Sequence, residues 1–199
     1  MIDCKASIQA KFNRGNHILF SRESECLQEL IALIGMQKHR TLVMWALDCA
    51  VEPLEYFESK YPNETRLRRA LELSEAWARG VIKMPEAKRA ILDAHSVAKE
   101  IDDIECIALA HAVGHAGATV HTETHALGLV FYELTAIVRR AGIDQCESPV
   151  ENRIKTYFDR LLYWQANIDH LDVEWAAFLL DDNRPNKEQI LSEKRKSSI

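Results

Sequence analysis

The apolar residues of this chain recur along most of its length with the spacing of an α-helix. This repeat predicts helices over residues 21–35, 41–60, 63–79, 85–101 and 148–168. Gly and Pro are scarce, with 7 and 5 of 199 residues, so the chain lacks the turn residues that an all-β protein of this length needs. The pattern therefore predicts an all-α protein.

Residues 106–138 form the most apolar part of the chain. Apart from histidines, only Glu123 and Glu133 are charged there, and alanine and glycine crowd the first half. The segment divides at residues 121–125, and each half is too short and too polar to cross a membrane. We expect a single compact bundle of about seven or eight helices around a buried, Ala/Gly-rich central helical hairpin.

The two ends of the chain lack this regular pattern. We expect residues 1–20 to form an N-terminal arm, either a short strand pair or an extended chain around an Asn-Arg-Gly-Asn turn. Residues 21–180 predict one all-α domain, whose last short helix covers 173–180. Residues 181–199 predict a polar C-terminal tail that frays.

Charge and cysteine content narrow the class of protein. The chain has 25 Lys and Arg against 30 Asp and Glu, a net charge of −5, which disfavours nucleic acid as a partner. Its N-terminus is polar and lacks an apolar signal core, so we expect a cytoplasmic protein. The five cysteines are odd in number and include no CxxC pair, which suits a reducing compartment and excludes a cysteine-rich zinc module.

Asp48 is the first candidate for chemistry, because it lies within the apolar stretch 41–51. A buried carboxylate without a partner costs several kcal/mol or takes up a proton, so Asp48 needs a donor: a histidine, an arginine, a tryptophan N–H or a helix N-terminus. We expect a structural network of buried polar groups, with a catalytic acid or base as the alternative. The expected network contains Asp48, Trp77, His115, His121 and His125.

The histidines are the second candidate. His111 and His115 are four residues apart, as are His121 and His125, so each pair can share one helical face. Imidazoles bind zinc, iron, copper and nickel, which makes His115, His121 and His125 the alternative metal ligands. The H-x-E-x-H string differs from the HExxH of zinc proteases, no PCxxC of zinc deaminases follows, and no Glu-x-x-His of di-iron bundles occurs. Core packing, metal binding and acid–base catalysis all remain open, and no cofactor is expected.

Four tryptophans, Trp45, Trp77, Trp164 and Trp175, fall in predicted helices. We expect them to anchor the core, and a cofactor-stacking site is the alternative. The chain contains no G-x-S-x-G elbow, no P-loop and no G-x-G-x-x-G fingerprint, so none of these motifs indicates an enzyme.

Several short motifs follow one another over about residues 37–168. A Trp-Ala-x-Asp-Cys-Ala stretch precedes a proline, an arginine and an Ala-x-x-Trp helix; Gly-His-Ala, further histidines, a tyrosine and a Trp-Gln helix follow. In this order they resemble a bacterial family of helical immunity proteins from polymorphic toxin systems. The residues that carry the resemblance include Trp45, Asp48, Cys49, Arg66, Trp77, Tyr132 and Trp164. Residues 122–124 depart from the family, which has small or proline-like residues there.

The resemblance implies a non-enzymatic α-helical protein that binds and neutralises a cognate protein toxin in the bacterial cytoplasm. An acidic inhibitor suits a basic toxin, such as a nuclease, through electrostatic steering. The residues alone leave two alternatives: a metal-binding protein or metal-dependent enzyme that uses His115, His121 and His125, and a helical scaffold with an inert interior. A homo-oligomer is also compatible with the sequence, and no membrane partner is expected.

Overall fold

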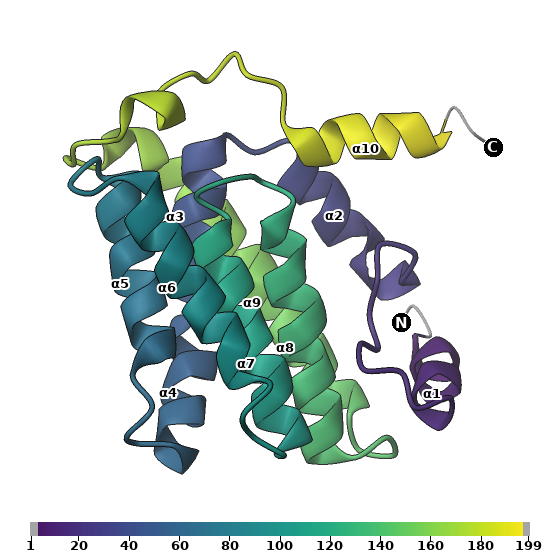
Figure 1. Cartoon of the computed structure of the whole chain (residues 1–199). Coiled ribbons are helices and arrows are strands. Elements are labelled where there is room, and N and C mark those ends of the chain that lie inside the picture. The colour runs from purple at the N-terminus through teal and green to yellow at the C-terminus, as the bar shows by residue number, and fades with distance from the viewer. Residues whose placement is uncertain (1–3, 197–199) are drawn as a thin grey trace.

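The computed structural model describes residues 4–196, and all regular secondary structure in that range is helical (Figure 1). The predicted all-α fold is confirmed. Between residues 28 and 167 the bundle consists of α2 (Gln28–Gly35), α3 (His39–Cys49), α4 (Val51–Lys60), α5 (Arg66–Ala78), α6 (Met84–Val97), α7 (Ile104–Ala118), α8 (His125–Ala141) and α9 (Glu147–Asn167).

The helices α7 and α8 form the central hairpin that the sequence predicts. In Figure 1, α5 and α6 lie on one side of this hairpin, and α3 and α9 lie behind it. Small residues allow the close packing, because a Cβ atom at Gly117 of α7 would lie only 2.7 Å from Ser74 Oγ of α5. The hairpin therefore occupies the middle of the bundle, where α3, α4, α5 and α6 all contact α7.

Local signals set the ends of the central helices. The Asp103 carboxylate accepts hydrogen bonds from the backbone N–H groups of Glu105 and Cys106, and so caps the first turn of α7. At the same, open end of the hairpin, Gly142 ends α8 with a φ of 76°, a conformation that favours glycine. These caps position the two helices that carry most of the histidines discussed below.

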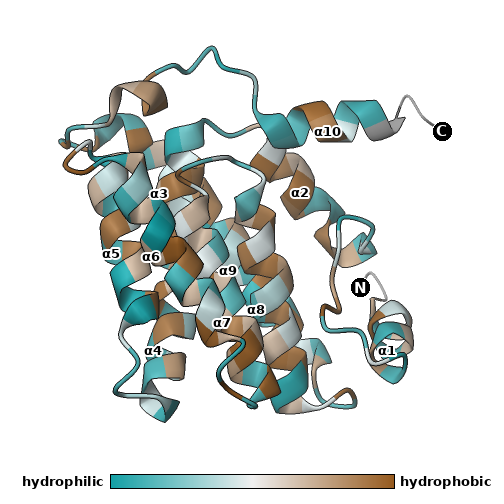
Figure 2. Cartoon of the chain, in the orientation of Figure 1, coloured by the Kyte–Doolittle hydropathy of each residue, from teal (hydrophilic) through white to brown (hydrophobic). Residues whose placement is uncertain are grey.

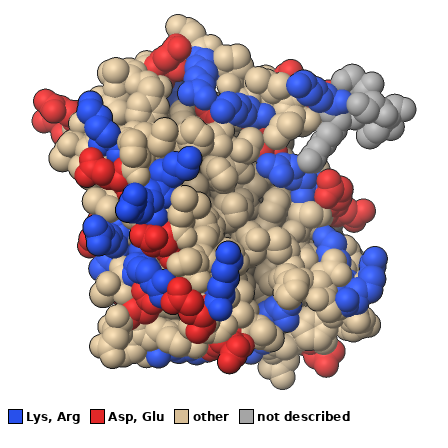
Figure 3. Space-filling view, in the orientation of Figure 1, with Lys and Arg blue, Asp and Glu red and all other residues tan. Residues whose placement is uncertain are grey.

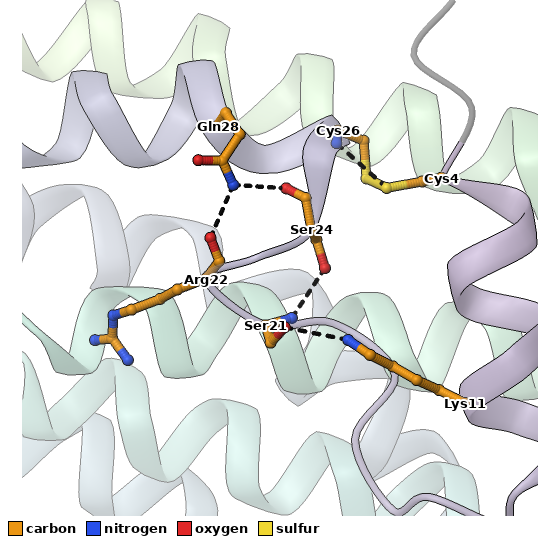
Figure 4. Close-up of a disulfide and its surroundings, with 7 residues drawn as sticks. All are labelled: Cys4, Lys11, Ser21, Arg22, Ser24, Cys26 and Gln28. Atoms are coloured by element: carbon orange, nitrogen blue, oxygen red, sulfur yellow. Dashed lines mark hydrogen bonds between the residues drawn. A yellow bond between two sulfur atoms is a disulfide. The ribbon is translucent and has the colours of Figure 1, made fainter. Parts of the chain in front are cut away.

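The N-terminal segment differs from the expected strand pair or extended arm. Residues Lys5–Asn13 form the helix α1, and a disulfide joins Cys4 to Cys26 within the short 3-10 turn Glu25–Leu27 that precedes α2 (Figure 4). Beyond α1, Leu19 and Phe20 are buried, and the Leu19 N–H donates to Thr135 Oγ1 of α8. The sequence pattern does not predict this pairing, because the two cysteines are 22 residues apart and belong to no recognisable motif.

The C-terminal segment also differs from the predicted frayed tail. Residues Lys187–Lys196 form α10, which packs on α2. The Asn186 side chain donates to the Ile34 and Gln37 carbonyls at 3.0 Å each, and buried Glu188 forms an ion pair with Arg22 at 2.7 Å. The predicted helix over 173–180 is reduced to a single 3-10 turn, Ala177–Leu179.

The distribution of hydrophobic residues follows this architecture. In Figure 2 the long connection that leads to α10 is largely hydrophilic, whereas brown, hydrophobic positions concentrate on the helices of the bundle. Among the described residues, no helix combines the length and the apolar character needed to span a membrane.

Candidate functional site

Four histidines come together where α6, α7 and α8 meet. His95 lies on α6, His111 and His115 share one face of α7, and His125 is the first residue of α8. The Nδ1 atoms of His95 and His111 are 3.0 Å apart, and those of His115 and His125 are 3.1 Å apart. The His95 and His115 rings meet edge to face with centroids 5.1 Å apart, so the two hydrogen-bonded pairs form one continuous cluster.

Two glycines make room for these rings. A Cβ atom at Gly114 would lie 2.7 Å from the His95 ring, and one at Gly128 would lie 2.4 Å from Cγ of His115. Tyr132 closes the cluster on α8, stacking on the His115 ring with centroids 5.3 Å apart. The Gly-His-Ala motif of the sequence therefore serves to seat imidazoles against helix backbones.

Burial keeps the clustered imidazoles neutral. Loss of hydration, followed by the effect of the neighbouring histidines, lowers the pKa of His95 to about 4 and that of His115 to about 3. Burial also lowers the pKa values of His111 and His125. At neutral pH each hydrogen-bonded pair therefore consists of two uncharged rings.

The cluster opens into a cavity of about 220 Å³, which we call the histidine pocket. Its lining includes Trp77, Lys88, Leu92, His95, His121 and His125. A larger, more open hollow of about 950 Å³, the Trp77 cleft, adjoins it, since Trp77 and Met84 line both. The Trp77 cleft lies between the α5–α6 turn and residues 173–180. Figure 3 shows a largely uncharged strip over α8 on this face, with charged side chains on either side.

Of the residues expected in the network, Trp77 and His121 lie next to each other. Their rings stack with centroids 6.3 Å apart, and Phe178 packs on Trp77 at 5.3 Å. His121 is exposed, whereas His115 and His125 are partly buried. The prediction thus brings together true neighbours, although its fully buried setting is wrong for His121.

The alternative metal set of His115, His121 and His125 gains no support from the geometry. His125 pairs with His115, while His121 stacks on Trp77. Within residues 4–196, no group of three or more His, Cys, Asp or Glu side chains is arranged to hold a metal ion. Glu123, the acid of the H-x-E-x-H string, is buried with its Oε1 3.5 Å from Nδ1 of His39 on α3.

Asp48 lies elsewhere, and its expected partners are corrected. Its carboxylate forms an ion pair with Arg160 and accepts a hydrogen bond of 3.0 Å from Trp164 Nε1, both on α9. The Asp48 side chain is 31% exposed, because one face of α3 reaches the surface beside α9. The sequence correctly requires a donor for this acid, and the donors are arginine and tryptophan rather than histidine.

A fully buried network at Glu133 was not among the predicted sites. Glu133 Oε1 lies 2.7 Å from Arg153 Nε, and the Tyr157 hydroxyl donates to Oε2 at 2.5 Å. Arg153 also donates to the Cys49 carbonyl and to Glu52, at 2.7 Å each. Burial raises the pKa of Glu133, and the Arg153 charge opposes that rise. The sequence offers one sign of this network, because Glu133 is an isolated charge in the apolar segment 106–138 and therefore needs a partner.

The remaining motif residues are structural. Trp45 is fully buried and donates to the Tyr157 carbonyl at 3.0 Å, so it links α3 to α9. Arg66 binds Glu64 and Glu100 at 2.6 Å each, which joins the start of α5 to the end of α6. Cys49 is buried, and burial raises its thiol pKa. Trp45 therefore anchors the core, as expected, and Cys49 is buried in the same core.

These features define an all-helical protein with buried polar clusters in an apolar core and two adjoining surface hollows at Trp77. The model of the Imm-5 like putative immunity protein family matches residues 32–160, and the chain belongs to that family. The matched region covers α3–α8 completely and includes every histidine of the cluster. No curated protein and no solved structure matched the chain.

Proposed function

We propose that this protein is an immunity protein that neutralises a cognate toxin by binding it directly, without catalysing a reaction. The family match over residues 32–160 carries this proposal, because it takes in the whole central part of the bundle. The net charge of −5 favours association with a basic toxin through electrostatic steering.

A binding role also agrees with the state of the cysteines. The three free cysteines, Cys49, Cys106 and Cys146, are buried. Burial raises the pKa of Cys106 to about 12 and raises the pKa values of the other two thiols. Since the thiolate is the nucleophilic form, these cysteines are unsuited to covalent catalysis at neutral pH.

The Trp77 cleft is the surface that best suits a protein partner. Trp77 and Met84 on one wall belong to the family-matched region, whereas Trp175, Phe178 and Leu180 on the other wall follow it. Leu180 is 54% exposed, and Val81, beside the cleft, is 75% exposed. Exposed apolar residues that gather around a hollow are typical of a protein-binding surface.

The test is protection of cells against the toxin encoded beside this protein's gene. We expect the protein to rescue growth and to copurify with that toxin. Leu180→Glu should abolish both effects by placing a charge in the apolar contact, whereas Leu162→Glu should retain them. Leu162 is a matched control because it is 51% exposed and lies on α9, outside the cleft.

The possible results distinguish the proposed immunity function from the proposed binding surface, the Trp77 cleft. Failure of the unaltered protein to protect against any toxin encoded nearby would overturn the proposed function. Protection that survives Leu180→Glu, with the variant still folded, would instead show that the toxin binds another face.

A further inference from the structure

We propose that the histidine pocket binds a small organic anion, specifically a carboxylate on a compact apolar body. The shape of the pocket, its charges and the hydrogen-bonding state of its histidines each support this assignment. The proposal does not depend on toxin binding.

The pocket has the size and lining of a small-ligand site. Its volume of about 220 Å³ suits a molecule near the lower end of the range for small-molecule sites. Trp77, Ile91 and Leu92 supply apolar walls, and the stacked ring of His121 extends the Trp77 surface. An aromatic or branched aliphatic group fits such walls.

The charges around the pocket favour an anion. Lys88 on α6 lines it, together with His95, His121 and His125. None of the described residues that line it is an aspartate or a glutamate. A carboxylate would therefore meet a cation and several imidazoles without a repelling acid.

Pairing through Nδ1 leaves the Nε2 atoms of His95 and His125 free to bind a ligand. His95 and His125 line the pocket, and each uses Nδ1 for its partner, His111 or His115. No hydrogen bond among the described residues engages Nε2 of His95 or His125, so this nitrogen is available to a ligand.

The tautomers of the two pairs can adapt to a carboxylate. In a neutral pair, one ring must donate from Nδ1 and the other must accept there. If His111 and His115 donate, then His95 and His125 each carry their proton on Nε2. Lys88 and these two N–H donors then belong to residues that line one pocket, and no imidazole needs to become charged to offer its donor to a carboxylate.

Binding of three probes of similar shape tests the proposal. The full-length protein is titrated at neutral pH with phenylacetate, phenylacetamide and phenethylamine, and binding is followed by calorimetry and by NMR of the histidine side chains. We expect saturable phenylacetate binding that shifts the ring signals of His95 and His125. The neutral amide should bind about tenfold more weakly, and the amine should not bind.

Two lysine variants locate the site. Lys88→Met should weaken phenylacetate binding by about fivefold or more because it removes the cation from the pocket. Lys155→Met is the matched control, since Lys155 is also exposed but lies on α9 outside the pocket, and it should leave the affinity unchanged. Melting curves of both variants verify that they fold.

Three results would overturn the proposal: no saturable phenylacetate binding up to about 20 mM, equal binding of the acid and the amide, or equal affinity in Lys88→Met. A protein that protects cells from a toxin and yet fails these titrations would refute only the anion site. Phenylacetate binding without protection would leave the anion site intact and refute the immunity role.

Discussion

At the scale of single residues, the histidine cluster shows how a polar group is accommodated in an apolar interior. His95 and His115 lose much of their hydration, and each recovers one hydrogen bond from another imidazole. The glycines beneath them provide the space that an alanine would fill. This arrangement disfavours the charged form of each ring, because burial reduces its hydration and the nearby imidazoles oppose a positive charge.

This preference for the neutral form makes stability depend on pH. The folded-state pKa values, about 4 for His95 and about 3 for His115, lie below the unfolded value of 6.5, so only the unfolded chain takes up protons between those limits. We therefore expect the free energy of unfolding to fall as pH drops below about 6.5, by about 1–2 kcal/mol for each of these histidines at pH 5. Urea unfolding at a series of pH values measures this loss.

His95→Gln should make that pH dependence shallower, because one of the responsible groups is removed. His17→Gln, at an exposed position, should leave the dependence unchanged. A stability that stays constant from neutral pH to pH 5 would contradict the assignment of neutral, buried imidazoles.

Asp48 and Glu133 show what sequence can and cannot predict about a single charge. Both acids stand alone in apolar helical segments, and both bind an arginine of α9. Yet the Asp48 side chain is 31% exposed, whereas Glu133 is only 3% exposed. The sequence pattern identifies the need for a partner, but the partner and the depth depend on the packing of a helix more than a dozen residues away.

At the scale of helices, two ion pairs connect α9 to the bundle: the buried pair Arg153–Glu133 and the partly exposed pair Arg160–Asp48. Arg153→Leu should destabilise the protein by about 3–5 kcal/mol, because it leaves the Glu133 carboxylate buried without its cation. Arg160→Leu should cost only about 0–1 kcal/mol, since its ion pair with Asp48 is 38% and 31% exposed and competes with water. Chemical denaturation of both variants gives the comparison, and equal losses would contradict the burial argument.

The predicted helices follow from a strong apolar repeat, and the missed ones lack it. The segments that become α5, α6 and α9 show the repeat clearly, so their ends are predicted to within a few residues. In contrast, α1 and α10 are short and largely polar. Contacts distant in sequence stabilise their surroundings, such as the Cys4–Cys26 disulfide and the Asn186 hydrogen bonds to α2, and the local pattern carries no sign of them.

At the scale of the whole molecule, the disulfide tethers the N-terminal segment that contains α1 to the turn that precedes α2. It closes a loop of 22 residues, which by chain entropy is worth about 3 kcal/mol. Reduction, or Cys4→Ser, should therefore speed hydrogen exchange over residues 5–27 while the amides of α7 and α8 keep their protection. Faster exchange throughout the hairpin would show instead that the N-terminal segment supports the core.

The ion pair between Arg22 and Glu188 makes the segments before and after the family-matched region depend on each other. The two residues lie on opposite sides of the family-matched region, and their ion pair draws the segments before and after it to the same helix, α2. An exchange of either flank between relatives would strand the buried Glu188 carboxylate or its arginine. Each flanking segment therefore depends on the other for its place on α2, although Arg22 and Glu188 are 166 residues apart along the chain.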